Sequence, residues 1–388
     1  RKDQTLLMKN PNTKRILTIV LVDLGAFLLF SFGVCAIVFN LFGGNQNLMQ
    51  EAKTLNTPTP APTQAPSDTP VPVMDTPAPA ENGTGAATAA PTEVPTPSPT
   101  PEPTGLLKGK FAEKFSEERI STEDTYRSQD IAIELTIIHG GFCESCRRVS
   151  HTADVCEYCG KTLHKTDKQD VYLADIYLQD MDAFRSFAIS HSGDVDKVKK
   201  LGQAHNAILA VNSDFYVNSK YNGYGWFVRN GEEIAKKKID SDLGILYLDG
   251  TMDTIDYKND TWSDDEIYSK YPRHIWYFGP ALLTADGQSK TSFNLHGPVA
   301  AANPRTVIGY YEPGHYMLMV VNGRRGSGDS RGLSLEELSI FCQDLGLAKA
   351  YNLDGGDSSA MYFNGQVYGP NGRGNSDIIY IAEPDTQA

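Results

Sequence analysis

The chain has 388 residues, of which 40% are hydrophobic, so it is long enough to bury a sizeable core. Its formal net charge of -13 argues against a protein that binds nucleic acid through a basic surface, because neutralising phosphates requires clustered Lys and Arg. We therefore expect no nucleic-acid partner. Positive charge is concentrated only in residues 1–15, which we interpret as a cytoplasmic basic tail.

An apolar segment follows at residues 16–42. It contains one charged residue, Asp23, and about 20 apolar residues suffice to cross a bilayer as a helix. A cleaved signal peptide is the alternative, but the segment is longer than a typical signal core and no clear small-residue cleavage site follows it. Because the basic tail precedes it, the segment predicts a single-pass protein of the cell membrane, with the N-terminus inside and the globular part outside.

Residues 43–104 predict a disordered stalk. Between residues 57 and 104 the sequence contains 14 Pro and 11 Thr but no Lys, Arg or aromatic residue. Such a composition cannot build a core, and it favours extended, solvated polyproline II structure. We expect the stalk to hold a domain away from the membrane, and its Thr-Pro content would permit O-glycosylation.

A charged neck and a globular domain complete the chain. In residues 105–127, Leu106, Phe111, Phe115 and Ile120 recur at roughly helical spacing, which predicts a helical neck. From residue 128 to 388, short β-like runs dominate, and helices are expected only near residues 194–202 and 334–346. The pattern predicts an α+β domain with a large mixed β-sheet core and a few packed helices.

Four cysteines form a compact motif inside an insert at about residues 139–166. A nine-residue gap separates two C-x2-C pairs, which can bring four thiolates to one tetrahedral Zn²⁺. Two disulfides are the rival interpretation, favoured by the outward compartment, although C-x2-C disulfides are typical of redox motifs. We expect a structural zinc knuckle between two runs that would otherwise pair as neighbouring strands; its ligands are Cys143, Cys146, Cys156 and Cys159.

Polar residues interrupt the apolar runs at their ends, where sheets place loops that bind and react. An Arg can bind an anionic oxygen with two hydrogen bonds, and glycines let backbone N–H groups approach a phosphate. A neighbouring carboxylate can act as acid, base or nucleophile on a glycosidic bond. The candidates are Asn212 and Asp214, then Arg305, then Asn322 with Arg324, and lastly Asp354 with Gly355, Gly356, Ser358 and Ser359.

Each of these patches also has a purely structural interpretation. The Asp- and Gly-rich segment at residues 354–357 is typical of a turn. Glu337 lies three residues after Ser334 at a predicted helix start, so we interpret it as half of a capping box. Asn364 and Gly365 form the two-residue signal of a β-hairpin turn.

Six motifs in chain order resemble the phosphodiester glycosidase family, which includes bacterial exopolysaccharide-associated proteins. They are YLADIYLQD, AVNSDFY, FGPALLTADG, NPRTVIGY, VVNGRRGSGDSRGLSLEEL and NLDGGDSSAM, between residues 128 and 382. The resemblance implies an enzyme that removes a sugar, N-acetylglucosamine in the best-known case, from a phosphodiester-linked glycan. It implies that Arg305 and Arg324 hold the phosphate, that Asp354 supplies acid-base or nucleophilic chemistry, and that Asn212, Ser358 and Ser359 orient oxygens.

Two positions depart from the family pattern. Asp214 follows Asn212 and Ser213 where the family has NGGF, and Asp357 replaces a third glycine after LDGG. The resulting prediction is a membrane-anchored hydrolase that cleaves sugar-1-phosphodiester linkages in a cell-surface glycan or polymer, with Asp354, Asn212 and Asp214 as catalytic candidates. The alternative is a non-catalytic protein that binds cell-wall glycan or anionic polymer, in which Asp214 and Asp357 hold Ca²⁺.

Overall fold

The computed structural model describes residues 105–189, 195–214, 225–293, 295, 299–324 and 330–384. The predicted basic tail, membrane helix and stalk lie outside these ranges. Within them, no helix is both long and apolar enough to cross a membrane.

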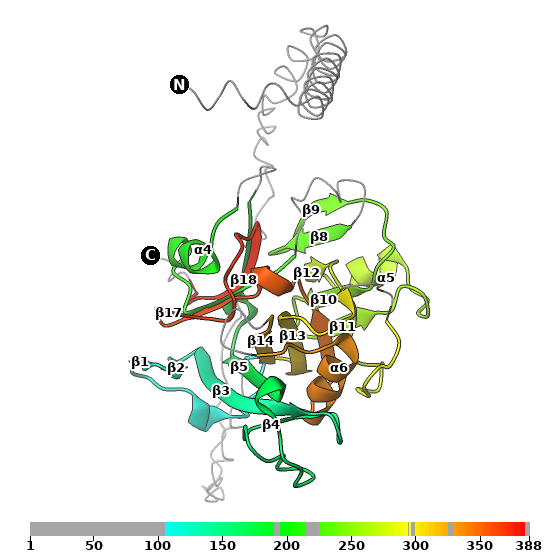
Figure 1. The fold of residues 1–388 in the computed structure, drawn as a ribbon. Coiled ribbons are helices and arrows are strands. Elements are labelled where there is room, and N and C mark those ends of the chain that lie inside the picture. The colour runs from blue at the N-terminus through cyan, green and yellow to red at the C-terminus, as the bar shows by residue number, and fades with distance from the viewer. Residues whose placement is uncertain are drawn as a thin grey trace, which may run out of the picture. The chain divides into compact units, whose positions relative to one another are not determined.

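Most of the regular secondary structure in the described ranges is β-strand, arranged in three sheets (Figure 1). The first sheet has the order β1-β2-β3-β5-β14-β13-β15, with β4 paired to β3. Its strands are β1 (Ile120–Ser121), β2 (Thr125–Arg127), β3 (Ile131–Cys143), β4 (Arg148–Ser150), β5 (Lys168–Leu178), β13 (Arg305–Glu312), β14 (His315–Val321) and β15 (Lys349–Asn352).

The other two sheets have five strands each. The second has the order β11-β10-β12-β8-β9, and the third has the order β17-β16-β7-β18-β6. The second contains β8 (Trp226–Arg229), β9 (Glu232–Lys236), β10 (Leu243–Tyr247), β11 (Met252–Ile255) and β12 (Pro272–Trp276). The third contains β6 (Phe184–Ala188), β7 (Leu209–Asn212), β16 (Met361–Phe363), β17 (Gln366–Tyr368) and β18 (Asp377–Ile381).

Helices are few in the described ranges, as the sequence predicts for an α+β domain. The α-helices there are α4 (Val198–Ala204), α5 (Asp264–Ser269) and α6 (Leu335–Asp344). Single 3-10 turns occur at η1 (Ala112–Lys114), η2 (Lys165–Asp167), η3 (Met181–Ala183) and η6 (Gly356–Ser358). The capping box is confirmed, because the Ser334 Oγ accepts from the Glu337 N–H and the Ser334 N–H donates to the Glu337 carboxylate.

The predicted large mixed sheet is wrong in two respects. The described strands form three sheets, and every pair of neighbouring strands in them is antiparallel. Parallel neighbours need long crossover connections, usually helical, and this domain has few helices to supply them. Hairpins such as the predicted Asn364-Gly365 turn between β16 and β17 join several of the strands instead.

The predicted helical neck is also wrong. Residues 105–127 contain the single turn η1 and the strands β1 and β2. Leu107 is buried with Ala132 and Tyr177 of the first sheet, and Phe111 and Phe115 pack against the same cluster. The apolar spacing therefore reflects a segment laid over a sheet, with turns at positive φ in place of helix.

The first sheet is buried on both faces. Along β14, Leu318 and Val320 lie in a core shared with the third sheet, whereas Met317, Met319 and Val321 lie in the core under α6. This explains why β14 is an unbroken apolar run, because alternate side chains enter different cores. The sheet consequently supports the polar residues that lie at the ends of its strands β13, β14 and β15.

Candidate active site

A cavity of about 190 Å³ opens at one end of the first sheet. Strand β13 starts at Arg305, and its antiparallel neighbours β14 and β15 end at Val321 and Asn352, so the loops after both strands meet the start of β13. This pairing gathers motifs that are far apart in the sequence. The cavity is lined by Phe278, Val299, Asn303, Arg305, Arg324, Asp354, Gly355, Gly356, Asp357 and Arg373.

Asp354 provides a largely buried carboxyl group that lines this cavity. Its side chain is 14% exposed, and it accepts hydrogen bonds from the Arg373 Nη2 at 2.8 Å and from the Gly355 N–H at 2.9 Å. Burial raises the pKa of Asp354 above its ordinary value, and the nearby Arg373 and Ser358 only partly offset that effect. A carboxyl group with a raised pKa beside a cation suits acid-base chemistry near neutral pH.

Arg373 was not among the predicted site residues. It lies in the loop between β17 and β18, and it donates to Asp354 and, at 2.8 and 2.5 Å, to the buried Ser358 Oγ. The Nη1 group has no partner in the described residues, and the side chain is 58% exposed. The only sequence signal is an arginine between two glycines in a polar loop, a weak pattern by itself.

Arg324 also lines the cavity. Its Nε and Nη2 donate to the Asn303 Oδ1 at 3.2 and 3.1 Å, and its Nη1 lies 3.3 Å from an Asp357 carboxylate oxygen. The guanidinium lies directly over Gly356, where an added Cβ would come within 3.0 to 3.3 Å of it. Gly356 also has a φ of +65°, so the glycine is required both for the turn and for the position of Arg324.

Arg305 lines the same cavity, but most of its hydrogen-bond donors are already bonded to backbone carbonyls. Its Nε donates to the Leu333 carbonyl, and its Nη2 donates to the carbonyls of Val299 and Ala301. Burial without a directly bonded carboxylate lowers its pKa to about 10. Arg305 therefore holds two loops of the cavity wall, and Arg373 is better placed than Arg305 to complete an anion site with Arg324.

Asn212 does not line the cavity, although it was predicted to be catalytic. It is fully buried, and its Nδ2 donates to the Asp354 carbonyl at 2.6 Å while its Oδ1 accepts from Thr306 and from the Ala360 N–H. These bonds fix the backbone on both sides of the Asp354 loop. Asn212 is consequently a positioning residue.

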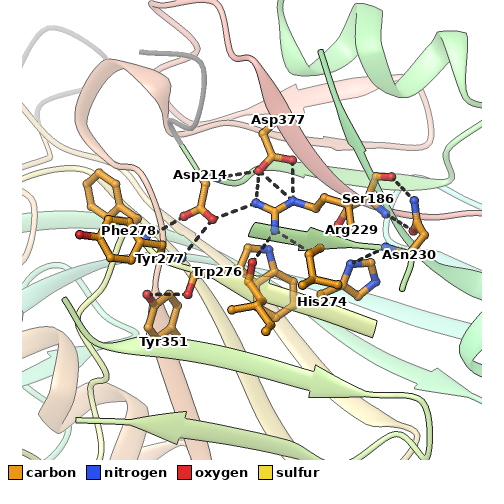
Figure 2. Close-up of polar contacts among 12 residues, drawn as sticks. Ser186, Asp214, Arg229, Asn230, His274, Trp276, Tyr277, Phe278, Tyr351 and Asp377 are labelled. Carbon is orange, nitrogen blue, oxygen red and sulfur yellow. Dashed lines mark hydrogen bonds and ion pairs between the residues drawn. The ribbon is translucent and has the colours of Figure 1, made fainter. Parts of the chain in front are cut away.

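Asp214 is part of a buried ion network outside the cavity (Figure 2). Its carboxylate accepts from Arg229 at 2.8 Å and from the N–H groups of Tyr277 and Phe278, while Arg229 also binds Asp377. Burial and the neighbouring Asp377 raise the pKa of Asp214 to about 6, although Arg229 opposes them. Asp214 is connected to the cavity through Phe278, whose backbone N–H donates to the Asp214 carboxylate and which itself lines the cavity.

The structure therefore does not support the predicted catalytic role of Asp214, nor a calcium site shared with Asp357. The Asp214 carboxylate is fully buried and satisfied, whereas the Asp357 side chain is 59% exposed and pairs with Arg324. In the described part of the chain, the side chains that cluster as possible metal ligands are cysteines.

The remaining predicted residues are structural. The buried Ser358 orients Arg373, and the Ser359 Oγ is buried with no hydrogen-bond partner in the described ranges. Asn322 is buried, and its Oδ1 accepts from the next backbone N–H. An added Cβ on Gly355 would lie 2.8 Å from the Pro304 carbonyl oxygen, so that glycine permits close packing of the loop.

Three arginines and two aspartates thus surround one small cavity, and this balance favours an anionic ligand. Residues 205–382 match the phosphodiester glycosidase family. All the cavity residues fall within this match, and the resemblance inferred from the motifs is confirmed over it. The family match begins after the first motif, YLADIYLQD, in β5.

Two solved structures are similar to part of the chain at low identity. The catalytic domain of zebrafish N-acetylglucosamine-1-phosphodiester alpha-N-acetylglucosaminidase, auto-inhibited by its pro-peptide, is 17% identical, with a TM-score of 0.48 over 69% of this chain and 87% of that chain. A hypothetical protein from Synechocystis is 11% identical, with a TM-score of 0.47 over 66% and 62%. No curated protein matches the chain significantly, so the phosphodiester glycosidase assignment depends on the family match.

The cysteine module lies outside the phosphodiester glycosidase match, between β3 and β5. These strands pair from Ile131↔Leu178 to Gly141↔Lys168, as predicted for runs interrupted by an insert. The four Sγ atoms lie within 4.8 Å of one another, and all four thiols are free. Two pairs of Sγ atoms, each with one cysteine from either C-x2-C motif, are 3.5 Å apart. These separations fit four thiolates around one tetrahedral metal ion, which this module can bind; the pairs are Cys143 with Cys159 and Cys146 with Cys156.

Proposed function

We propose that the domain is a hydrolase that cleaves sugar-1-phosphodiester linkages, with N-acetylglucosamine or a similar sugar as the released group. The observation that supports this most strongly is the pairing of the buried Asp354 with Arg373 in a cavity that also contains Arg324. The family match over the same residues supports it independently.

In this proposal Arg324 and Arg373 bind the phosphate. Both side chains are about half exposed, at 52% and 58%, and both line the cavity, so a ligand can reach them. A phosphate that binds Arg373 would compete with Asp354 for its hydrogen bonds, which raises the basicity of the carboxylate at the moment the substrate arrives. Asp354 then acts on the attacking water or on the anomeric carbon.

The reaction breaks the bond between the anomeric carbon and the phosphate oxygen. Water supplies a hydroxyl group to that carbon, the phosphate monoester leaves with both bonding electrons, and the proton of the water passes to the enzyme or solvent. The two arginines stabilise the charge that develops on the departing phosphate.

The test uses the methyl phosphodiester of N-acetylglucosamine 1-phosphate in water enriched in ¹⁸O. We expect free sugar that carries ¹⁸O, and a loss of about 10²–10⁴-fold in kcat for Asp354→Asn. Asp253→Asn is the matched control, because Asp253 is an exposed partner of Lys270 and is not among the residues that line the cavity.

Other outcomes would change the proposal in defined ways. Label in the phosphate would show a phosphodiesterase that breaks the P–O bond. Binding of the phosphodiester without release of sugar would favour the alternative, a non-catalytic glycan-binding protein. Undiminished turnover in Asp354→Asn would remove Asp354 from the mechanism.

We further propose that residues 16–42 anchor the chain in the cell membrane and that the hydrolase faces outward on its stalk, where a cell-surface glycan or phosphodiester-linked sugar polymer is its substrate. The length of the apolar segment and the basic residues before it support this arrangement. Protease added to intact cells should remove the domain and leave the N-terminal tail protected. Release of the chain by alkaline carbonate would contradict a membrane span.

For the cysteine module we propose Zn²⁺ as the metal, because four-thiolate sites of this spacing are typical structural zinc sites. The purified chain should contain about one zinc per molecule, with the four thiols protected until the metal is removed. An absence of metal together with an absence of free thiols in the module would establish disulfides instead. One equivalent of a different metal would show that the module is a metal site but that the metal is not zinc.

A further inference from the structure

The cysteine module is docked on α6 at both ends of that helix. Arg147, directly after the second cysteine, forms an ion pair of 2.9 Å with Glu336, and Arg148 forms one of 3.0 Å with Asp344. Phe142, next to the first cysteine, is 1% exposed and belongs to the core formed with α6. The knuckle is thus fixed to the helix that supports one face of the first sheet.

Arg331 connects this module with the start of α6. Its guanidinium lies 4.5 Å from the centre of the Phe142 ring and donates to both Glu337 oxygens at 2.8 and 3.1 Å. It also donates to Glu144, which lies between the first two cysteines, at 3.1 Å. Arg331 is 19% exposed and Glu337 is 9% exposed, whereas Glu144 is 68% exposed, so the contacts with Glu337 and the Phe142 ring hold Arg331 more firmly than the contact with Glu144.

The two residues after Arg331 support the wall of the proposed phosphate site from behind, because they contact Asn303 and Arg305, which line it. Gly332 packs so closely on Asn303 that an added Cβ would lie 2.7 Å from the Asn303 backbone. Leu333 and Asn303 form a backbone bridge, and the Leu333 carbonyl accepts from Arg305. Asn303 in turn holds the guanidinium of Arg324.

We propose that the metal-loaded cysteine module braces this wall through Arg331, which acts as a positioning residue for Asn303 and Arg324. The metal closes both knuckles, and this fixes the end of β3, where the first cysteine is the last residue of the ladder with β4. Phe142 and Glu144 then hold the Arg331 side chain in place. Arg331 in turn fixes the following backbone, at Gly332 and Leu333, which contacts Asn303 and Arg305. The role rests on the proposed phosphate site and adds a function for an insert outside the family match.

The first experiment removes the metal from the purified chain with a strong chelator under reducing conditions and then restores Zn²⁺. Hydrogen exchange should speed up in residues 299–305 and 330–337 on removal and recover on addition, while β18 stays protected. Binding of inorganic phosphate should weaken by roughly 2- to 30-fold, the range expected for coupling through packed contacts. Unchanged exchange and phosphate affinity in the metal-free chain would overturn the proposal.

The second experiment compares Arg331→Met, Arg331→Lys and the control Arg148→Met in the metal-loaded chain. Arg148 docks the module at the far end of α6, where it pairs with Asp344, and none of its contacts in the described ranges is with a residue of the wall. Arg331→Met should raise KM for the phosphodiester by roughly 2- to 30-fold with kcat nearly unchanged, because the arginine wall binds the phosphate in ground and transition states alike. Arg331→Lys should recover only part of the loss, since lysine lacks the planar fork.

Equal effects of the Arg331 and Arg148 variants would show general destabilisation and refute a specific brace. If the chain releases no sugar under any condition, the proposed hydrolase fails, but phosphate binding and hydrogen exchange still decide the brace. If Arg331→Met does not fold, the lysine variant and metal removal carry the same comparison.

Discussion

Substituting Arg229 by Met should strongly destabilise the domain. The guanidinium is 3% exposed and binds two carboxylates that are fully buried, Asp214 and Asp377. It also donates to the carbonyls of Val228 and Ile275 within the second sheet, and its ion pair with Asp377 of β18 joins that sheet to the third (Figure 2). Methionine fills similar space but provides no charge and no donor.

The magnitude follows from leaving buried charge without compensation. Removing one partner of a buried ion pair costs about 3–5 kcal/mol. In a domain of this size, about 2–4 °C of Tm is lost per kcal/mol, so we expect a fall of about 6–20 °C. Arg119→Met is the control, because Arg119 is 65% exposed and its single ion pair is 3.6 Å long; its Tm should hardly change.

The pH dependence provides the sharper assay. Without Arg229, the folded-state pKa of Asp214 rises further above its unfolded value, near 3.8. A carboxyl group with a raised folded pKa contributes stability that is full below the unfolded pKa and is lost as pH rises through the folded pKa. The free energy of unfolding that Arg229→Met loses relative to the unmodified chain, measured with urea, should therefore be small near pH 4 and grow toward pH 7.

A deficit that is constant with pH would refute this reasoning, because loss of packing alone does not titrate. A loss below about 1 kcal/mol at pH 7 would show that water or another donor compensates the two carboxylates.

Three further predictions concern the carboxyl groups of Asp214 and Asp354 and the glycine Gly356, which lines the cavity. The stability of the unmodified chain relative to Asp214→Asn should fall by up to about 3 kcal/mol between pH 4 and pH 7, because the pKa of Asp214 is raised to about 6. Asp354→Asn should keep or raise the Tm at pH 7 while activity falls, because burial also raises the pKa of Asp354. Gly356→Ala should raise KM, since its Cβ would displace Arg324.

Each of these has a result that would contradict it. For Asp214→Asn it is a stability difference that does not change with pH, and for Asp354→Asn it is a fall in Tm of more than a few degrees at pH 7. Gly346→Ala is the control for Gly356→Ala, because Gly346 has a φ of +75° with nothing near its Cβ position. If both alanine variants raise KM equally, displacement of Arg324 is not the cause.

Much of the local structure could be predicted from sequence, because it depends on neighbours along the chain. Alternation and apolar runs located most strands, and the Ser334–Glu337 pair marked the start of α6. The spacing of the cysteines predicted that four thiols would meet, which the structure confirms. The two runs around the insert pair directly as β3 and β5.

The arrangement of the strands could not be obtained in the same way. Whether neighbouring strands are parallel or antiparallel, and how many sheets they form, depends on contacts between segments far apart in the chain. The spacing of Phe111 and Phe115 fits a helix as well as a segment packed on a sheet, and only the burial against Tyr177 distinguishes them.

The sequence by itself determined that Arg305, Arg324 and Asp354 lie at or just beyond the ends of apolar runs, where loops bind and react. Only the tertiary structure decided their roles. Asp214 and Asp354 both follow a strand, yet one carboxylate is neutralised by Arg229 inside the protein and the other faces a cavity beside Arg373. The reason is physical: burial and charge partners set the chemistry of a carboxyl group, and both come from segments that the local sequence does not contain.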